Sequence, residues 1–190
     1  MNILLFDDNG RDDLLPLCYT RPCGDLRVGI LTIAKKWEHH LAAQVSFLTQ
    51  DYLSIKFPAT YTQENYYING RLLVNRAILD LIQELQAGQS LHKDGNILAF
   101  KSSETYKNYT AIEDACTSKT EAEIALDLIT YTHDIFTFNG RQIHADFETL
   151  TAGRKSEEVS KTNTFIGDNI FIEEGVSMEA SVLNSTSGPI

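Results

Sequence analysis

Short apolar runs separated by polar stretches predict several strands in the first half of the chain. The run from Asn2 to Phe6 ends at Asp7-Asp8-Asn9-Gly10, a pattern typical of a buried strand that is followed by a loop. Three later runs have the same character, and each predicts a further strand: Gln44 to Thr49, Tyr66 to Ile68, and Asn96 to Lys101.

Apolar residues at helical spacing fill the intervals between these runs. Asp25 is a good N-cap, and the apolar side chains after it fall on one face of a helix that extends to Leu41. Asn75 is a second candidate cap, for a helix through Leu85. Helices are also predicted over Thr120 to Thr130 and over Gly140 to Thr151, the latter with Ile143, Phe147 and Leu150 inward. Because strands alternate with helices, we expect an α/β layered domain with a mostly parallel sheet.

A six-residue period distinguishes the C-terminal segment, Thr162 to Thr186. Two aliphatic series share this period: Ile166, Ile172 and Met178, and Ile170, Val176 and Val182. The period fits a parallel β-helix, in which each hexapeptide forms one face of a coil. Since about three or more repeats are needed for stability, we expect the chain to be a piece of a longer polypeptide that ends inside a solenoid. The alternative is an ordinary hairpin with a turn at Glu173-Glu174-Gly175.

The predicted plan therefore has three parts. Residues 1–155 form the α/β domain, residues 156–162 form a polar linker, and residues 163–190 form the truncated start of a hexapeptide-repeat β-helix.

Composition narrows the classes of function. The 190 residues carry a net charge of −10, which argues against a general surface for nucleic acid or for an anionic membrane. The N-terminus lacks a basic segment and no apolar run approaches the length of a membrane span, so neither a signal peptide nor a membrane helix is expected. Cys18, Cys23 and Cys116 are too few and too scattered for a disulfide framework or a zinc site, and we expect reduced thiols in a cytoplasmic protein.

The loop after the first strand contains most of the candidate chemistry. Because open α/β sheets bind ligands at the carboxyl ends of their strands, the segment from Phe6 to Gly29 is expected to face a ligand. It offers three candidate phosphate partners and two positions for close backbone approach: Arg11, Arg21 and Arg27, and Gly10 and Gly24. The alternative is a solvated loop whose charges pair with one another.

Acidic residues in the same loop are candidate cation ligands. Asp7, Asp8, Asp12 and Asp13 could hold a divalent cation, because hard cations take carboxylate oxygens. Asp25 stands at a predicted helix start, where it either caps the helix or contacts a substrate. The chain has neither a G-x-x-x-x-G-K-[ST] loop nor a G-x-G-x-x-G fingerprint.

Several motifs of this loop resemble those of the sugar-1-phosphate nucleotidyltransferases that are fused to a left-handed β-helix. Gly10-Arg11 resembles the end of that family's Gly-rich loop, Pro16-Leu17-Cys18 resembles its Pro-Leu-Thr, and Arg21-Pro22 stands where Lys-Pro would stand. The bifunctional N-acetylglucosamine-1-phosphate uridyltransferase/glucosamine-1-phosphate acetyltransferase is the best-known example. Three stretches are similar to a divergent branch found in Bacteroidetes-type bacteria: Leu14 to Glu38, Tyr66 to Asn75, and Phe138 to Ser156.

The resemblance implies a Rossmann-like, GT-A-like enzyme. Such an enzyme transfers a nucleotidyl group from a nucleoside triphosphate to a sugar-1-phosphate, giving a nucleotide-sugar and pyrophosphate. UTP and N-acetylglucosamine-1-phosphate are the expected pair, while thymidylyl and guanylyl transfer stay open. The alternatives are a degenerate module that only binds nucleotide or sugar phosphate, and a structural domain that positions a downstream acyltransferase β-helix. Relatives with a β-helix imply a homotrimer of the full-length protein.

The resemblance also implies roles for particular residues. Arg11 and Arg21 would clamp phosphates, with Arg27 next, and Gly10 and Asp25 would contact substrate. Asn69-Gly70-Arg71 stands where the family has a Gly-Asp whose carboxylate binds Mg²⁺. An arginine cannot ligate a cation, so three alternatives stay open: the Mg²⁺ lies elsewhere, at Asp7, Asp8 or Asp146, or Arg71 replaces part of its charge, or the domain has lost catalysis. Asn69 and Arg71, at a predicted strand end, would face the sugar phosphate, and Asp7 or Asp8 would hold either Mg²⁺ or the edge of the base.

Overall fold

The computed structural model describes residues 1–190 and has a six-stranded central sheet in the order β2-β1-β3-β5-β4-β6. β1 pairs in parallel with β2 and β3, and β4 pairs in parallel with β6, whereas β5 is antiparallel to both of its neighbours. The predicted α/β class with a mostly parallel sheet is confirmed. The strands are β1 (Asn2–Phe6), β2 (Val45–Leu48), β3 (Asn65–Asn69), β4 (Gln89–Lys93), β5 (Asn96–Ser102) and β6 (Ser118–Glu121).

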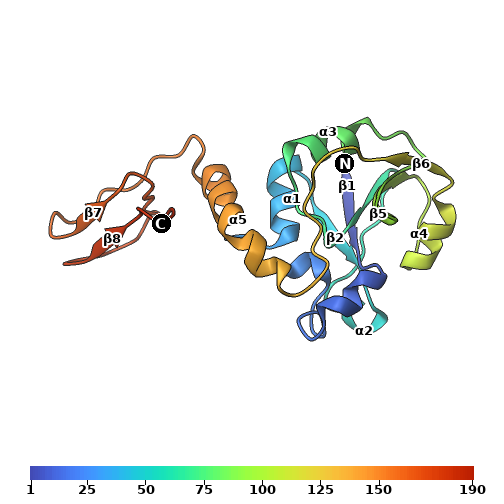
Figure 1. The fold of residues 1–190 in the computed structure, drawn as a ribbon, viewed down its shortest axis with the longest axis horizontal. Helices are drawn as coiled ribbons and strands as arrows, with labels where there is room; N and C mark the ends of the chain where they lie inside the picture. The colour runs from blue at the N-terminus through green and yellow to red at the C-terminus, as the bar shows by residue number, and fades with distance from the viewer.

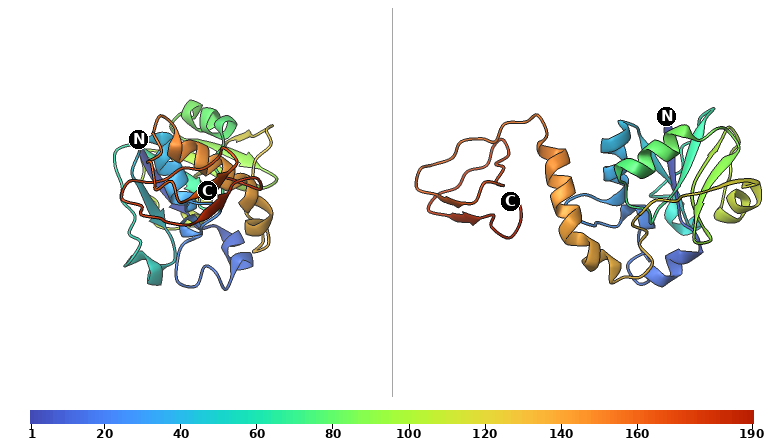
Figure 2. Two further views of the ribbon diagram at one scale, coloured as in Figure 1. Left: turned by 90° about the vertical axis from the view of Figure 1, so that its left-hand side faces the viewer. Right: turned by 45° about the horizontal axis from the view of Figure 1, so that its top comes forward.

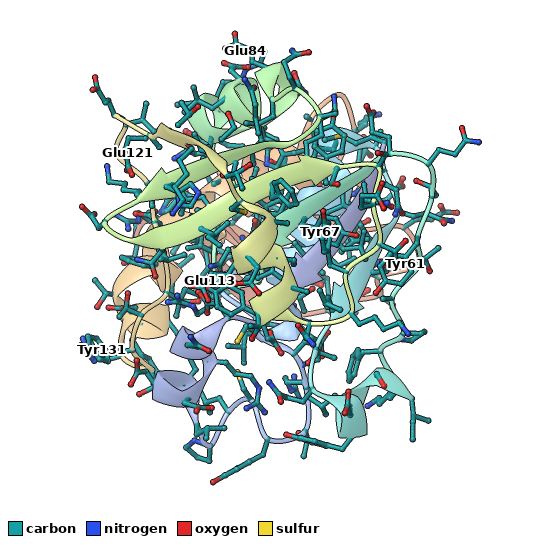
Figure 3. The ribbon with its side chains drawn as sticks, turned by 90° about the vertical axis from the view of Figure 1, so that its right-hand side faces the viewer. Tyr61, Tyr67, Glu84, Glu113, Glu121 and Tyr131 are labelled. Atoms are coloured by element: carbon teal, nitrogen blue, oxygen red, sulfur yellow. The ribbon has the colours of Figure 1, made fainter.

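Helices cover both faces of this sheet (Figure 1). α1 (Ile33–Leu41) and α3 (Arg76–Glu84) share the larger core with one face of the central strands, to which β1 contributes Ile3 and Leu5. α4 (Tyr109–Ala115) packs on the opposite face through Ile112, beside Leu4 and Phe6 of β1. In Figure 3 the viewer looks onto this second face, and α4, marked by Glu113, lies in front of the sheet. β1 is therefore buried on both sides, which explains its continuous apolar run.

Short helical turns follow the first two strands. They are η1 (Asn9–Leu14), η2 (Cys23–Asp25) and α2 (Asp51–Ser54). In Figure 1 the loop after β1 and α2 lie together at the lower end of the sheet, which is the carboxyl end of β1.

The predicted start of the first helix is wrong, whereas the predicted cap of the second is confirmed. α1 begins at Ile33 with Thr32 as its cap, because Gly29 adopts a φ of +89° and turns the chain before the helix can start. Asp25 lies in η2 instead of capping α1. The cap predicted at Asn75 is confirmed, since its side chain accepts a hydrogen bond from the Ile78 amide at 2.9 Å.

The helix predicted over Thr120 to Thr130 is absent. β6 occupies the start of this segment, and its backbone pairs with β4. Leu128 forms a bridge with Leu72, and the Leu73 amide donates to the Asp127 carbonyl at 2.9 Å. The segment is extended because its backbone groups hydrogen-bond to neighbouring strands and loops.

α5 (Asp134–Thr151) is longer than predicted, and its buried residues are polar. Its buried residues are Gln142 and Asp146, whereas Ile143, Phe147 and Leu150 are only half-buried. The predicted inward face is therefore wrong, because α5 contacts the turn before α1 through polar groups.

The C-terminal segment lies on the far side of α5 from the sheet (Figures 1 and 2). β7 (Thr164–Ile166) and β8 (Val182–Asn184) form a parallel pair, with Thr164 opposite Val182. A hairpin would pair antiparallel strands, so the hairpin alternative is wrong. None of the helices combines the length and apolar composition needed to cross a bilayer.

Candidate active site

The carboxyl ends of β1, β2 and β3 converge on one region. The Asp7 amide donates to the Leu48 carbonyl at 2.9 Å, which joins β1 to β2. The Gly70 amide donates to the Phe6 carbonyl at 2.8 Å, which joins β1 to β3. Polar residues that follow these three strands are thereby gathered at one edge of the sheet, where open α/β sheets bind their ligands.

A cavity of about 510 Å³ opens beside these strand ends. Its lining is mostly polar, and Lys107 is the single basic side chain in it. Burial raises the pKa of Tyr109 to about 12, so its hydroxyl keeps its proton at neutral pH. The lining residues are Asp7, Asp8, Asn9, Leu48, Thr49, Gln50, Asp51, Tyr52, Lys107, Asn108, Tyr109 and Thr110.

Asp8 forms a buried bidentate ion pair with Arg71. The Arg71 Nε and Nη2 donate to the two carboxylate oxygens of Asp8 at 2.7 and 2.6 Å. The same carboxylate accepts the Gly10 amide at 3.1 Å and the Asn69 side-chain amide at 2.8 Å. Asp8 lines the cavity, but Gly10, Asn69 and Arg71 are not among the lining residues. In this arrangement these three residues fix the position of the Asp8 carboxylate.

Asp7 ties the loop to the strand ends. It accepts the Cys23 amide at 2.9 Å and the Thr49 hydroxyl at 2.5 Å. Burial raises its pKa above the ordinary value, although these hydrogen bonds and the nearby Arg11 act in the opposite direction. Asp7 is therefore a carboxyl group whose charge is disfavoured by its surroundings.

The predicted phosphate clamp Arg11 is buried and turned toward the protein. Its Nη2 donates to the Cys18 carbonyl at 2.7 Å and to the Tyr52 hydroxyl at 2.8 Å. Its Nε lies 3.7 Å from Asp7 and is the one buried side-chain nitrogen or oxygen without a hydrogen-bond partner. In this position Arg11 supports the Tyr52 wall of the cavity.

Arg21, Arg27 and Asp25 lie on the loop outside the cavity lining. Arg21 is exposed, and its nearest carboxylate, Asp25, is 3.9 Å away. Arg27 is exposed as well and donates to the Ile30 carbonyl. The loop reaches the cavity rim at Tyr52, whose hydroxyl donates to the Tyr19 carbonyl at 2.9 Å. Arg21 thus belongs to a segment that adjoins the cavity.

A resident Mg²⁺ at the Asp7-Asp8 pair does not fit the residues as placed. An ionised carboxylate has about four lone-pair directions, and Asp8 already accepts four hydrogen bonds. No three His, Cys, Asp or Glu side chains gather into a group that could hold a metal ion. Asp146 is also committed, because it accepts the Ile30 and Leu31 amides and pairs with Lys36.

Several cavity residues were absent from the sequence-based candidates. Thr49 and Gln50 follow β2 directly, so the rule that identified Asp7 and Asp8 after β1 would also have identified them. Lys107 and Asn108 precede α4, a helix that the periodicity did not predict. Only their place in the fold brings them to the cavity.

The raised pKa of Asp7 predicts a pH-dependent stability. The folded state keeps a proton on Asp7 at pH values where the unfolded state has lost it. The contribution of Asp7 to the free energy of unfolding therefore falls as pH rises from about 4 through the raised pKa. Urea unfolding of the wild type and of Asp7→Asn, compared at several pH values, measures this contribution. We expect the wild type to lose stability relative to the variant as pH rises, and a constant or opposite difference would contradict the assignment.

A search of curated proteins found no match to this sequence. The sequence model of the sugar nucleotidyl transferase family matches residues 3–155. Apart from Asn2, the first residue of β1, the matched region contains the six strands of the central sheet, the loop after β1 and every residue that lines the cavity. The chain therefore belongs to the sugar nucleotidyl transferase family.

Proposed function

We propose that the full-length protein transfers a uridylyl group from UTP to N-acetylglucosamine-1-phosphate and releases pyrophosphate. Membership of the family supports nucleotidyl transfer to a sugar phosphate. The observation that carries the proposal is the polar cavity at the ends of β1 and β2, because it lies in the matched region and where such sheets bind ligands. The choice of uracil and N-acetylglucosamine rests on the sequence resemblance, and thymidylyl and guanylyl transfer are the alternatives.

The proposed chemistry requires positioning more than proton transfer. An oxygen of the sugar phosphate attacks the α-phosphorus of the triphosphate, and the bond from that phosphorus to the departing pyrophosphate breaks. Because the attacking phosphate is already ionised, the protein contributes orientation and charge neutralisation. Lys107 is available in the cavity for a phosphate, and Asn9, Gln50 and Asn108 offer amide donors and acceptors for base or sugar groups.

Arg21 is the proposed second phosphate partner. Its exposed pair with Asp25 is a weak surface contact, so a phosphate can displace it. We expect Arg21→Ala to lower turnover by about a hundredfold, the scale seen when one group that stabilises transition-state charge is removed. Pyrophosphate release from UTP and N-acetylglucosamine-1-phosphate measures the effect. Arg76→Ala is the matched control, since Arg76 is an exposed arginine on α3 away from the cavity lining.

Two results bear on the role of Arg21 in different ways. Unchanged turnover in soluble, folded Arg21→Ala would remove Arg21 from the proposed site. An equal loss of turnover in Arg76→Ala would show that turnover responds to the overall charge of the protein and not to a local contact of Arg21.

The second candidate is a module that binds nucleotide or sugar phosphate without catalysis. Two observations favour it: Arg11 is held by protein groups, and Asp8 is saturated by Arg71 and its neighbours. This candidate predicts that UTP or the sugar phosphate binds in calorimetry while no nucleoside triphosphate and sugar-phosphate pair releases pyrophosphate. Release from any pair would exclude it.

The C-terminal segment is proposed to begin a left-handed β-helix. The register of β7 and β8 supports this, because Thr164 lies opposite Val182 and three hexapeptides separate them. Exposed aliphatic side chains such as Val182 would be covered by a following coil. In this proposal the α/β domain also positions the β-helix, through which full-length molecules would form a trimer.

A further inference from the structure

The coordination of Asp8 resembles that of a carboxylate in a metal site, with a guanidinium where the metal would be. Arg71 contacts both carboxylate oxygens, and the remaining two hydrogen bonds come from Gly10 and Asn69. Asp8 is only 7% exposed and Arg71 only 2% exposed, so the pair is shielded from water. A charge in such a place persists only when it is paired and hydrogen-bonded.

The rest of the Arg71 side chain is fixed by neighbouring elements. Its Nη1 donates to the Ile129 carbonyl at 2.9 Å, and its Nη2 also reaches Asn96 at 3.2 Å. A Cβ on residue 10 would overlap the guanidinium, so the glycine there allows Arg71 to lie against the loop. Arg71 is thereby held between the end of β1, the β4–β5 turn and the segment around Ile129.

We propose that Arg71 is the permanent cation of this site and takes the place of a divalent metal in the coordination of Asp8. The pair is neutral, because one positive charge meets one carboxylate, and it leaves Asp8 without a free ligand direction. Asp7 remains as a single carboxylate, and Mg²⁺ that meets one protein carboxylate commonly takes further ligands from substrate phosphates. The free protein therefore holds no divalent ion at Asp8. This inference concerns the protein without substrate and does not depend on its activity.

Binding of Mn²⁺ to the free full-length protein tests the proposal, with Mn²⁺ as a spectroscopic substitute for Mg²⁺. In the wild type, the Gly10 amide donates to Asp8, so its NMR signal reports a paramagnetic ion bound there. We expect this signal to broaden no more than those of exposed amides as Mn²⁺ is added. Selective broadening of Gly10, at Mn²⁺ concentrations below that of the protein, would overturn the proposal without need of any variant.

Variants test whether Arg71 is what excludes the metal. We expect Arg71→Met to gain a Mn²⁺ site, with at least about tenfold tighter binding than the wild type, as counted by the electron paramagnetic resonance signal of free Mn²⁺. The added change Asp8→Asn should abolish the gain. If folded Arg71→Met binds no more Mn²⁺ than the wild type, the proposal that Arg71 takes the place of a metal at Asp8 is wrong.

Lys36→Met is the matched control for this gain. Lys36 is also a buried cation paired with one aspartate, Asp146, whose other oxygen accepts two backbone amides. We expect no Mn²⁺ site in this variant, because the partners of Asp146 are two backbone amides and Lys36, with no carboxylate directly beside it in sequence, whereas Asp8 directly follows Asp7. An equal gain in Lys36→Met would show that any unpaired buried aspartate attracts Mn²⁺, and would overturn the specific role of Arg71.

Discussion

Replacing Arg71 with methionine is expected to lower the free energy of unfolding by about 3–5 kcal/mol, the range for breaking a buried ion pair by removing one partner. The change leaves the Asp8 carboxylate buried with two of its four hydrogen bonds. It also leaves the Ile129 carbonyl and the Asn96 side chain without their contacts to the guanidinium. Urea unfolding monitored by circular dichroism measures the loss.

Two further variants distinguish the effect of breaking the buried Asp8–Arg71 pair from the effect of removing any positive charge. Arg76→Met removes an exposed arginine paired with Asp80 four residues away on α3, and we expect a change of at most about 0.5 kcal/mol. Adding Asp8→Asn to Arg71→Met should recover part of the lost stability, because no unpaired carboxylate then remains buried. If Arg71→Met lowers the free energy of unfolding by less than about 1 kcal/mol, the Asp8–Arg71 pair is not a major contributor to stability.

Asp146→Ala is expected to destabilise the protein by about 3 kcal/mol or more and to loosen α5. Asp146 accepts the amides of Ile30 and Leu31 at 2.8 and 3.0 Å and pairs with the buried Lys36. Removing it leaves two amides and one ammonium group without their partner. Hydrogen exchange should therefore speed up along α5 more than along α3, which has no contact to Asp146.

The effect of Asp146→Ala should depend on pH. Burial lowers the pKa of Lys36, and Asp146 opposes this shift in the wild type. Without Asp146 the folded state releases the Lys36 proton below the pH at which the unfolded state does, so stability rises with pH through that window. We therefore expect Asp146→Ala to lower the free energy of unfolding less at pH near 10 than at pH 7.

Asp127→Ala is the matched control, because Asp127 makes a more exposed pair with Arg141, another residue of α5. Asp127→Ala should lower the free energy of unfolding by less than about 1 kcal/mol. A loss as large as that of Asp146→Ala would show that α5 is not held mainly by the buried carboxylate.

The main strands could be predicted because their signal is local. β1 is buried on both faces and reads as a continuous apolar run; β3 lies beside β1, and β5 lies beside β3. β4 was missed because Gln89, Ser90, His92 and Lys93 give it a polar composition although its middle is buried. The false helix after Thr120 contains Ile124, Leu126 and Leu128, which alternate as in an extended segment and pack against the core.

The site could be predicted only in part for a related reason. The rule that ligands meet the carboxyl ends of strands correctly brings Asp7 and Asp8 to the cavity. The pairing of Asp8 with Arg71 spans 63 residues, and that of Lys36 with Asp146 spans 110 residues. No local pattern encodes such partners, so the arginines and aspartates of the loop could not be divided into paired and available groups before the fold was known.

Transfer of a labelled α-phosphate tests the central claim most directly. The full-length protein is incubated with Mg²⁺, N-acetylglucosamine-1-phosphate and UTP that carries a radiolabel at the α-phosphorus, and the products are separated by chromatography. The account predicts that the label appears in a nucleotide-sugar in step with the release of pyrophosphate. Two results together would contradict it. In the first, the label stays in UTP or passes only to UMP or UDP. In the second, the same experiment with the other nucleoside triphosphates also gives no nucleotide-sugar.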